Sequence, residues 1–296
     1  MGPDYPGVPR AFRMSRVGEK QFYSGIVGRM IIFGDNTVQS TRMSTNQSLA
    51  AAEMQAKGRP LQKMFNRVPR HYDFLNRLLT FRLDEHWRKK AVDKVLDEPV
   101  ERVMDLGTGT GDMAVRIARK SPQTQVVGYD FSASMLEVAR RKAQRYKMEN
   151  IEFVEGDAAS MPFDDESFDV VGISFAFRNI TFKNPHTGQY LKETYRSLKP
   201  GGKFVIVESS QPRSSLVRYF FHAYLNYIVS GIGGRISRAK GAYHYLAYSA
   251  RHFYTRRELT ELLEQYGFTG VRHHPMLLGA AAVTVAIKPY SPPFNA

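Results

Sequence analysis

Short apolar runs alternate with helical stretches along most of the chain after residue 100. Five runs of four to seven residues have the length and the flanking turn residues of buried strands. They cover residues 103–106, 125–130, 151–157, 168–174 and 204–208. The stretches between them include helix-forming sequences such as 113–118. This alternation predicts an α/β fold with a mostly parallel sheet, whose ligand site lies at the carboxyl ends of the strands.

The last part of the chain carries signals for one more helix and two more strands. Thr255 and Glu258 have the spacing of a capping box, which predicts a helix over residues 259–266 that ends at Gly267. Residues 268–274 and 280–287 then have the composition of strands, with a turn near 275–279. We expect these strands to close the sheet as an antiparallel hairpin.

The chain before residue 100 divides into two parts. Residues 1–53 show no sustained period and are rich in Gly, Pro, Ser, Thr and Asn, so we interpret them as a poorly ordered extension. Met43 and Met54 leave open that translation begins there. From residue 61, aromatic and apolar residues at helical spacing predict short helices that cover the sheet or its ligand. The predicted domain therefore spans 54–290, and 291–296 form a loose tail.

A glycine-rich turn follows the first apolar run. Gly107, Gly109 and Gly111 alternate with other residues in the stretch from Val103 to Asp112. Glycines permit a tight turn and a close approach to bare backbone, and the first N–H groups of the next helix are free donors. By itself, such a turn can be an ordinary connection between a strand and a helix.

Two acids after the next strands favour a ligand site. Asp130 ends the second apolar run, about twenty residues beyond the turn, where a carboxylate can accept bonds from both ribose hydroxyls of an adenosine ligand. Asp157 ends the third run in the same way. Parallel strands bring these carboxyl ends to one edge of the sheet.

This series resembles the class I S-adenosylmethionine-dependent methyltransferases. Their glycines fall at every second position, as here, whereas dinucleotide dehydrogenases more often show G-x-G-x-x-G. The resemblance implies a Rossmann-like α/β fold with a mostly parallel seven-stranded sheet, a helical cap over the substrate site, and S-adenosylmethionine as cofactor. It also implies that Asp130 binds ribose, that Asp157 and Ala158 bind adenine, and that the turn receives the methionine part. The expected cofactor residues are Asp105, Gly107, Gly109, Thr110, Gly111, Asp130, Asp157, Ala158 and Ser174.

Further motifs are similar to those of the C-methyltransferases of ubiquinone and menaquinone biosynthesis. These motifs are Tyr72-Asp-x-x-Asn76, Thr80-Phe81 with Trp87, Ser174-Phe-Ala-Phe-Arg-Asn179, Tyr195-Arg-Ser-Leu-Lys-Pro-Gly-Gly202 and Ala242-Tyr-His-Tyr-Leu246. In the entry motif two positions depart from the family, because Thr80 replaces a serine and Asp84 replaces a histidine; in the motif that begins at Ser174, Ala176 and Phe177 are also substituted. The resemblance implies C-methylation of a polyprenylated quinol, with demethylmenaquinol before others. Another lipophilic or phenolic substrate stays open, as does an RNA methyltransferase or RNA-binding module.

The candidate catalytic residues follow the fourth strand and the family motifs. Arg178 is expected to stabilise an oxyanion of the quinol, and Asn179 to add a hydrogen bond. An ion pair that braces the loop is the alternative role of Arg178. The motifs imply ring-positioning roles for Tyr72, Asn76, Tyr243 and Tyr245. The proton acceptor is unassigned, with His244 and His252 as candidates.

Charge and composition bear on the partners. The formal net charge is +14, and residues 209–257, an expected cap insertion, contain arginines and aromatic residues but no acid. Such a surface suits nucleic acid or anionic lipid, and the resemblance favours a lipid-borne quinol with peripheral contact to an anionic membrane. Nucleic acid is the less favoured partner, and a homodimer is compatible with the sequence. The chain has no cysteine, which fits a cytoplasmic protein, and no metal-ligand spacing, so no metal is expected.

Overall fold

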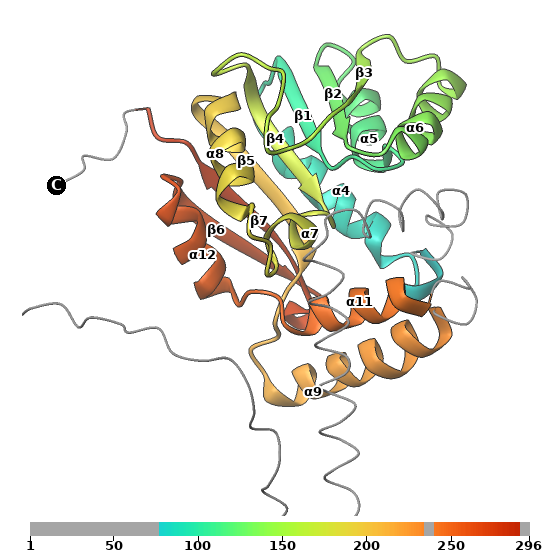
Figure 1. The fold of residues 1–296 in the computed structure, drawn as a ribbon. Coiled ribbons are helices and arrows are strands. Elements are labelled where there is room, and N and C mark those ends of the chain that lie inside the picture. The colour runs from blue at the N-terminus through green and yellow to red at the C-terminus, as the bar shows by residue number, and fades with distance from the viewer. Residues whose placement is uncertain (1–76, 234–239, 291–296) are drawn as a thin grey trace, which may run out of the picture. The chain divides into compact units, whose positions relative to one another are not determined.

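The computed structural model describes residues 77–233 and 240–290. Its sheet has seven strands in the order β3-β2-β1-β4-β5-β7-β6 (Figure 1). Strands β1 to β5 pair in parallel, whereas β7 runs antiparallel to both β5 and β6. This is the expected mostly parallel sheet with a closing hairpin. The strands are β1 (Arg102–Leu106), β2 (Gln125–Asp130), β3 (Ile151–Glu155), β4 (Phe168–Ser174), β5 (Leu198–Ser209), β6 (Thr269–Met276) and β7 (Ala281–Ile287).

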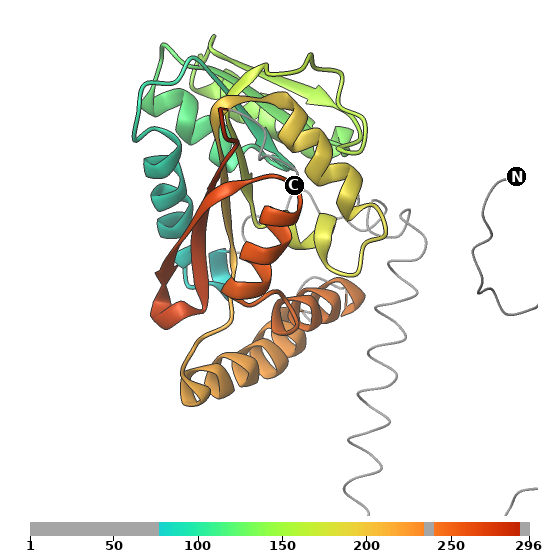
Figure 2. The same cartoon turned by 90° about the vertical axis from the view of Figure 1, so that its left-hand side faces the viewer.

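Helices cover both faces of the sheet, as the two views show (Figures 1 and 2). One face carries α4 (Leu83–Val95), α5 (Asp112–Lys120) and α6 (Ala133–Arg145). The other carries α7 (Phe177–Thr181), α8 (Thr187–Ser197) and α12 (Arg256–Gln265). The capping box predicted at α12 is present, since Thr255 and Glu258 bond to each other's backbone N–H groups. Gly267 follows this helix at φ 89°.

Consecutive residues of the central strands pack into two separate hydrophobic cores, one on each face of the sheet. Met104, Val171 and Ile206 pack toward the face of α8 and α12, whereas their neighbours Val103 and Val170 pack toward the face of α4 and α5. Strand side chains alternate between faces, so a parallel sheet covered on both faces needs an apolar residue at nearly every position. This explains why continuous apolar runs in the sequence predicted the strands.

A helical cap follows the carboxyl end of β5. It consists of α9 (Ser215–Tyr224), the π-helix η1 (Leu225–Gly233) and α11 (Lys240–Arg251), and η1 packs along α11. Sequence spacing predicts that Leu216, Phe220, Tyr224 and Tyr227 share one helical face. The sequence offers this face as a docking surface, and in the structure Leu216, Phe220 and Tyr227 are exposed while Tyr224 is partly buried. The helix changes from α to π geometry at Leu225, which shifts the register of the residues beyond it.

The short 3₁₀ helix η2 (Leu277–Gly279) connects β6 to β7. Within the described ranges, the structure has no helix with the length and apolar composition needed to cross a membrane. The predictions of a poorly ordered extension over 1–53 and a loose tail over 291–296 concern residues outside those that the structure describes, and they stay predictions.

Candidate active site

The glycine turn joins β1 to α5, and its three glycines differ in what surrounds them. All three lie at positive φ, between 55° and 79°. A side chain at Gly107 would place its Cβ 2.7 Å from the Cβ of Ala176, and one at Gly111 would come within 2.8 Å of the Cβ of Ala139 on α6. A Cβ at Gly109 would meet nothing within 4 Å. Gly109 therefore faces open space, whereas Gly111 lets α5 approach α6.

Asp105 lies beneath this turn and holds its shape. Its Oδ2 accepts hydrogen bonds from the Thr108 hydroxyl at 2.7 Å and from the Ala114 N–H at 2.9 Å. Burial raises the pKa of Asp105 to about 7, although these two bonds oppose the rise. Its Oδ1 is buried without a hydrogen-bond partner among the described residues. The site thus has a buried acceptor that a ligand donor could satisfy.

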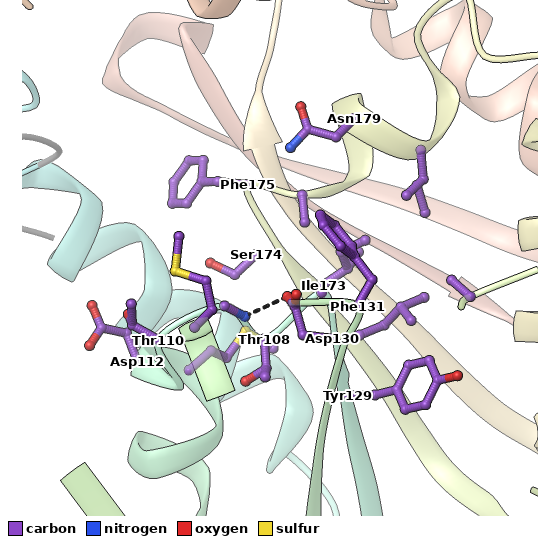
Figure 3. Close-up of a pocket in the computed structure, with 18 of the residues that line it drawn as sticks. Thr108, Thr110, Asp112, Tyr129, Asp130, Phe131, Ile173, Ser174, Phe175 and Asn179 are labelled. Atoms are coloured by element: carbon purple, nitrogen blue, oxygen red, sulfur yellow. Dashed lines mark hydrogen bonds between the residues drawn. The ribbon is translucent and has the colours of Figure 1, made fainter. Parts of the chain in front are cut away.

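Asp130 ends β2 directly beside the turn (Figure 3). Its Oδ2 accepts from the Gly109 N–H at 2.8 Å, and its Oδ1 accepts from the Ser132 N–H at 2.9 Å. Burial raises the pKa of this carboxyl group, and the backbone donors counteract the shift. Two carboxylate oxygens have about four acceptor sites, so Asp130 can accept further bonds from a ligand.

A pocket extends from the turn across the ends of β2 and β4, and we call it the turn pocket. It has a volume of about 110 Å³ and is lined by Gly107, Thr108, Gly109, Thr110, Asp130, Phe131, Ala158, Ser174, Phe175 and Asn179, among others (Figure 3). Asp105 and Gly111 lie behind this lining, and Asp157 is exposed beyond it, with its Oδ1 bonded to the Ala159 N–H. The structure thus brings six of the nine predicted cofactor residues to one pocket wall.

The turn pocket fits S-adenosylmethionine in its chemistry. Open space at Gly109 admits a ligand to bare backbone, and the Asp130 carboxylate lies in the wall where ribose hydroxyls need an acceptor. Ala158 and Phe131 supply apolar contact for a base. The unpartnered Oδ1 of Asp105 is a buried acceptor behind this lining.

A second and larger cavity lies between the sheet and the cap, and we call it the apolar cavity. Its volume is about 470 Å³, within the size range of small-molecule sites. Its walls come from α4, α9, η1, α11 and η2, and they are formed mainly by Leu79, Leu83, Trp87, Phe175, Val217, Phe221, Tyr224, Leu225, Val229, Leu246 and Ala250. Phe175 and Arg88 also line the turn pocket. The two cavities therefore share a wall.

Arg178 lines the apolar cavity and is bound to a carboxylate that the sequence analysis missed. Its Nη1 lies 2.8 Å from Glu208 Oε1 and 2.8 Å from the Ser209 hydroxyl, and both members of the ion pair are buried. The Arg178 Nε is buried without a partner among the described residues. Glu208 ends the fifth apolar run, so the rule that identified Asp130 and Asp157 would have indicated it too.

The two departures from the family motif contact each other. The Thr80 hydroxyl donates to Asp84 Oδ1 at 2.7 Å, and Arg88 Nη1 donates to Asp84 Oδ2 at 2.6 Å. Arg88 also donates from Nε to the Ser174 hydroxyl at 3.2 Å, and its guanidinium carbon lies 5.2 Å from the Phe175 ring centroid. Asp84, the residue that replaces a histidine, is thus a buried carboxylate in the wall of the apolar cavity.

The remaining catalytic candidates are distributed differently. Asn179 lines the turn pocket, so it lies on the other side of the shared wall from Arg178. Tyr245 is buried on α11 outside the cavity lining. His244 and His252 are exposed, and they contact the Ser230 hydroxyl and the Tyr248 carbonyl. Tyr72, Asn76 and the side chain of Tyr243 lie outside the described residues.

Comparisons with known proteins agree with this geometry. The profile of the ubiE/COQ5 methyltransferase family matches residues 53–288. A demethylmenaquinone methyltransferase of Thermus thermophilus is 39% identical over 226 residues, covering 76% of this chain and 100% of the relative. A ubiquinone/menaquinone biosynthesis C-methyltransferase UbiE of Geotalea daltonii is 38% identical over 234 residues, covering 78% of this chain and 97% of the relative. A Haloferax volcanii methyltransferase solved with the Trm112 activator has a TM-score of 0.53 at 20% identity, covering 76% and 97%, which concerns the fold alone.

Proposed function

The chain belongs to the ubiE/COQ5 methyltransferase family, and from this premise we propose that it C-methylates the reduced ring of a polyprenylated quinol, with demethylmenaquinol as the first candidate. It is an S-adenosylmethionine-dependent methyltransferase with a class I fold. The names of the relatives from Thermus thermophilus and Geotalea daltonii support the choice of substrate.

One observation carries the proposal: the apolar cavity adjoins the turn pocket through a shared wall. Phe175 and Arg88 contribute to both, and Phe175 adopts the left-handed region at φ 55°, which a non-glycine residue rarely does. Trp87 packs against the Phe175 ring at a centroid distance of 6.0 Å. A flat ring held at this wall would present one edge toward the turn pocket, while a hydrocarbon chain fills the cavity beneath the cap.

The chemistry requires the protein to position two reactants and to stabilise charge on the acceptor. When bound, S-adenosylmethionine supplies an activated methyl group on a positively charged sulfur. A quinol hydroxyl, as a phenol, loses its proton only near pH 10, so the ring carbon needs help to become nucleophilic. We infer that Arg178, which lines the apolar cavity, donates a hydrogen bond to the ring oxygen. Because Glu208 offsets its charge, Arg178 acts mainly as a directed donor.

The rim of the apolar cavity supports peripheral membrane contact as part of this function. Phe81, Phe220, Leu277 and Leu278 line the cavity, yet each exposes at least half of its surface. Exposed arginines at 213 and 218 flank this rim on α9 and the loop before it. Apolar side chains beside cations suit an anionic lipid surface, from which a polyprenylated substrate could enter.

Labelled methyl transfer tests the proposed substrate class. We expect the purified protein to move label from S-adenosylmethionine into the lipid extract of a quinone-producing bacterium and not into total RNA. Label in RNA with none in lipid would favour the rival class, an RNA methyltransferase. Label in a lipid other than a quinone would indicate another lipophilic acceptor.

A further inference from the structure

The wall of the apolar cavity contains a carboxylate that neither the family motifs nor the ring-positioning residues account for. Four ionisable side chains line this cavity within the described part of the chain: Asp84, Arg88, Arg178 and Tyr224. Arginines stay protonated, and burial raises the pKa of Tyr224 to about 12, so neither type can accept a proton at neutral pH. Among the described residues of the lining, Asp84 is therefore the group that can accept a proton.

Asp84 has acceptor capacity to spare. It receives one bond from Thr80 and one from Arg88, whereas a carboxylate offers about four acceptor sites. Glu208, the other buried acid nearby, already accepts four hydrogen bonds. They come from the side chain and the backbone N–H of Arg178, and from the hydroxyl and the backbone N–H of Ser209. Glu208 also lies outside the cavity lining. The two acids therefore differ in access to a bound ring.

We propose that Asp84 accepts the hydroxyl proton of the quinol during methyl transfer and returns it afterwards. This inference rests on the proposed function. Asp84 is held toward the shared wall by Arg88, which also bonds Ser174 in the turn pocket and lies 3.8 Å from Asp112. Arg178, on α7, lines the same cavity, so the ring oxygen can accept from Arg178 and donate to Asp84.

The proton balance is complete without another reactant. The ring carbon gives an electron pair to the methyl carbon, the new C–C bond forms, and the bond from sulfur to methyl breaks. As the ring loses electron density its hydroxyl becomes strongly acidic, so a carboxylate suffices to take that proton. The methylated carbon then releases its own hydrogen to water, the ring regains aromaticity, and the Asp84 carboxylic acid returns a proton to the oxygen. One proton leaves per methyl transferred.

Two substitutions separate this role from a structural one. Asp84→Asn keeps the size of the side chain and can still bond Thr80, whose hydroxyl can also accept, and Arg88. Because it removes one charge of the buried pair with Arg88, its melting temperature checks that the variant folds. We expect turnover to fall about 100-fold with unchanged affinity for S-adenosylmethionine and for quinol. Asp84→His supplies another base, so turnover should recover in part, and the acid limb of the pH–rate profile should move up toward about 6.5, the pKa of free histidine.

The matched control is Asp93→Asn, which changes a half-buried acid on the same helix that pairs with Lys120. It should behave as the wild type. Turnover of Asp84→Asn within threefold of wild type, or an acid limb of Asp84→His that stays in place, would overturn the role of Asp84 alone. Absence of quinol methylation by the wild-type protein would instead overturn the proposed function, and this inference with it.

Discussion

Single side chains around the glycine turn combine ligand contact with support of the backbone. Asp130 is one example, because its carboxylate holds the N–H groups of Gly109 and Ser132 and also lines the turn pocket. Asp130→Ala should lower the affinity for S-adenosylmethionine at least about tenfold, since each charge-assisted bond to ribose contributes about 1.5–3 kcal/mol. Calorimetry measures this, with circular dichroism as the check on folding. Wild-type affinity in a folded variant would reject the ribose contact.

Asp105 makes the stability of the ligand-free protein depend on pH. Burial raises its pKa to about 7, so the folded state binds the proton more tightly than the unfolded state does. The stabilisation by protonation is complete below about pH 4 and is lost as the pH rises through 7, a change of up to about 4 kcal/mol. Asp105→Asn mimics the protonated form, so the melting temperature of this variant relative to the wild type should increase from pH 5 to pH 8. The same difference in melting temperature at both pH values would contradict this.

Arg178 cannot be removed alone without exposing Glu208 to an unfavourable environment. Breaking a buried pair by deleting one partner costs about 3–5 kcal/mol, so Arg178→Met should be strongly destabilised. The double variant Arg178→Met, Glu208→Gln removes both charges and should keep a melting temperature closer to wild type. We expect it to bind S-adenosylmethionine normally but to lose about 100-fold in turnover, with partial recovery at high pH. Normal turnover in this double variant would leave Arg178 a purely structural role.

At the level of elements, the turn between β1 and α5 separates binding from packing. Gly109→Ala and Gly111→Ala both place a side chain at positive φ, so they share a backbone cost of about 1–2 kcal/mol. Only the side chain at Gly111 meets α6, at 2.8 Å from Ala139, whereas that at Gly109 enters open space. Gly111→Ala should therefore lose more thermal stability, and Gly109→Ala should lose more affinity for S-adenosylmethionine. The opposite ranking in a melting and titration series would refute this division.

The sequence sufficed for elements whose signals are local. The apolar runs, the capping box at Thr255 and the closing hairpin depend on neighbouring residues, and the structure confirms them. The Arg178–Glu208 pair joins residues 30 positions apart, and the bond from Arg88 to Ser174 joins residues 86 apart. Such contacts exist only once the sheet has formed, so no spacing rule indicates them. The packing role of Gly111 was hidden for the same reason, because its partner is on another helix.

The cap illustrates a limit of periodicity itself. A helical wheel assumes 3.6 residues per turn, and that assumption fails where α9 passes into η1 at Leu225. Val217, Phe221 and Leu225 line the apolar cavity together with Phe220 and Tyr224, two members of the predicted face. The apolar character of residues 209–257 was correctly noted, but the sequence left open which side of it faces inward.

For the whole molecule, the apolar rim predicts a measurable preference for anionic membranes. Sedimentation with anionic liposomes should weaken at high salt, on charge reversal at Arg213 and Arg218, and in the variant Phe220→Ser, Leu278→Ser. The cap insertion also contains Arg235 and Arg238, and charge reversal there should weaken sedimentation too, although both lie outside the described residues. Tyr146→Ser is the matched control, since Tyr146 is exposed but ends α6 near the amino ends of the strands. Equal partition onto neutral and anionic vesicles would remove the electrostatic part of this prediction. The homodimer and the cytoplasmic location stay predictions.

The central claim is that the turn pocket and the apolar cavity together direct a methyl group to a quinol carbon. Its most direct test is mass spectrometry of the product after incubation with methyl-labelled S-adenosylmethionine and demethylmenaquinol in lipid vesicles. The account predicts one labelled methyl group bonded to a ring carbon, formed from the reduced quinol and not from the oxidised quinone. A label on a ring oxygen, or no label on the quinol while RNA becomes labelled, would contradict it.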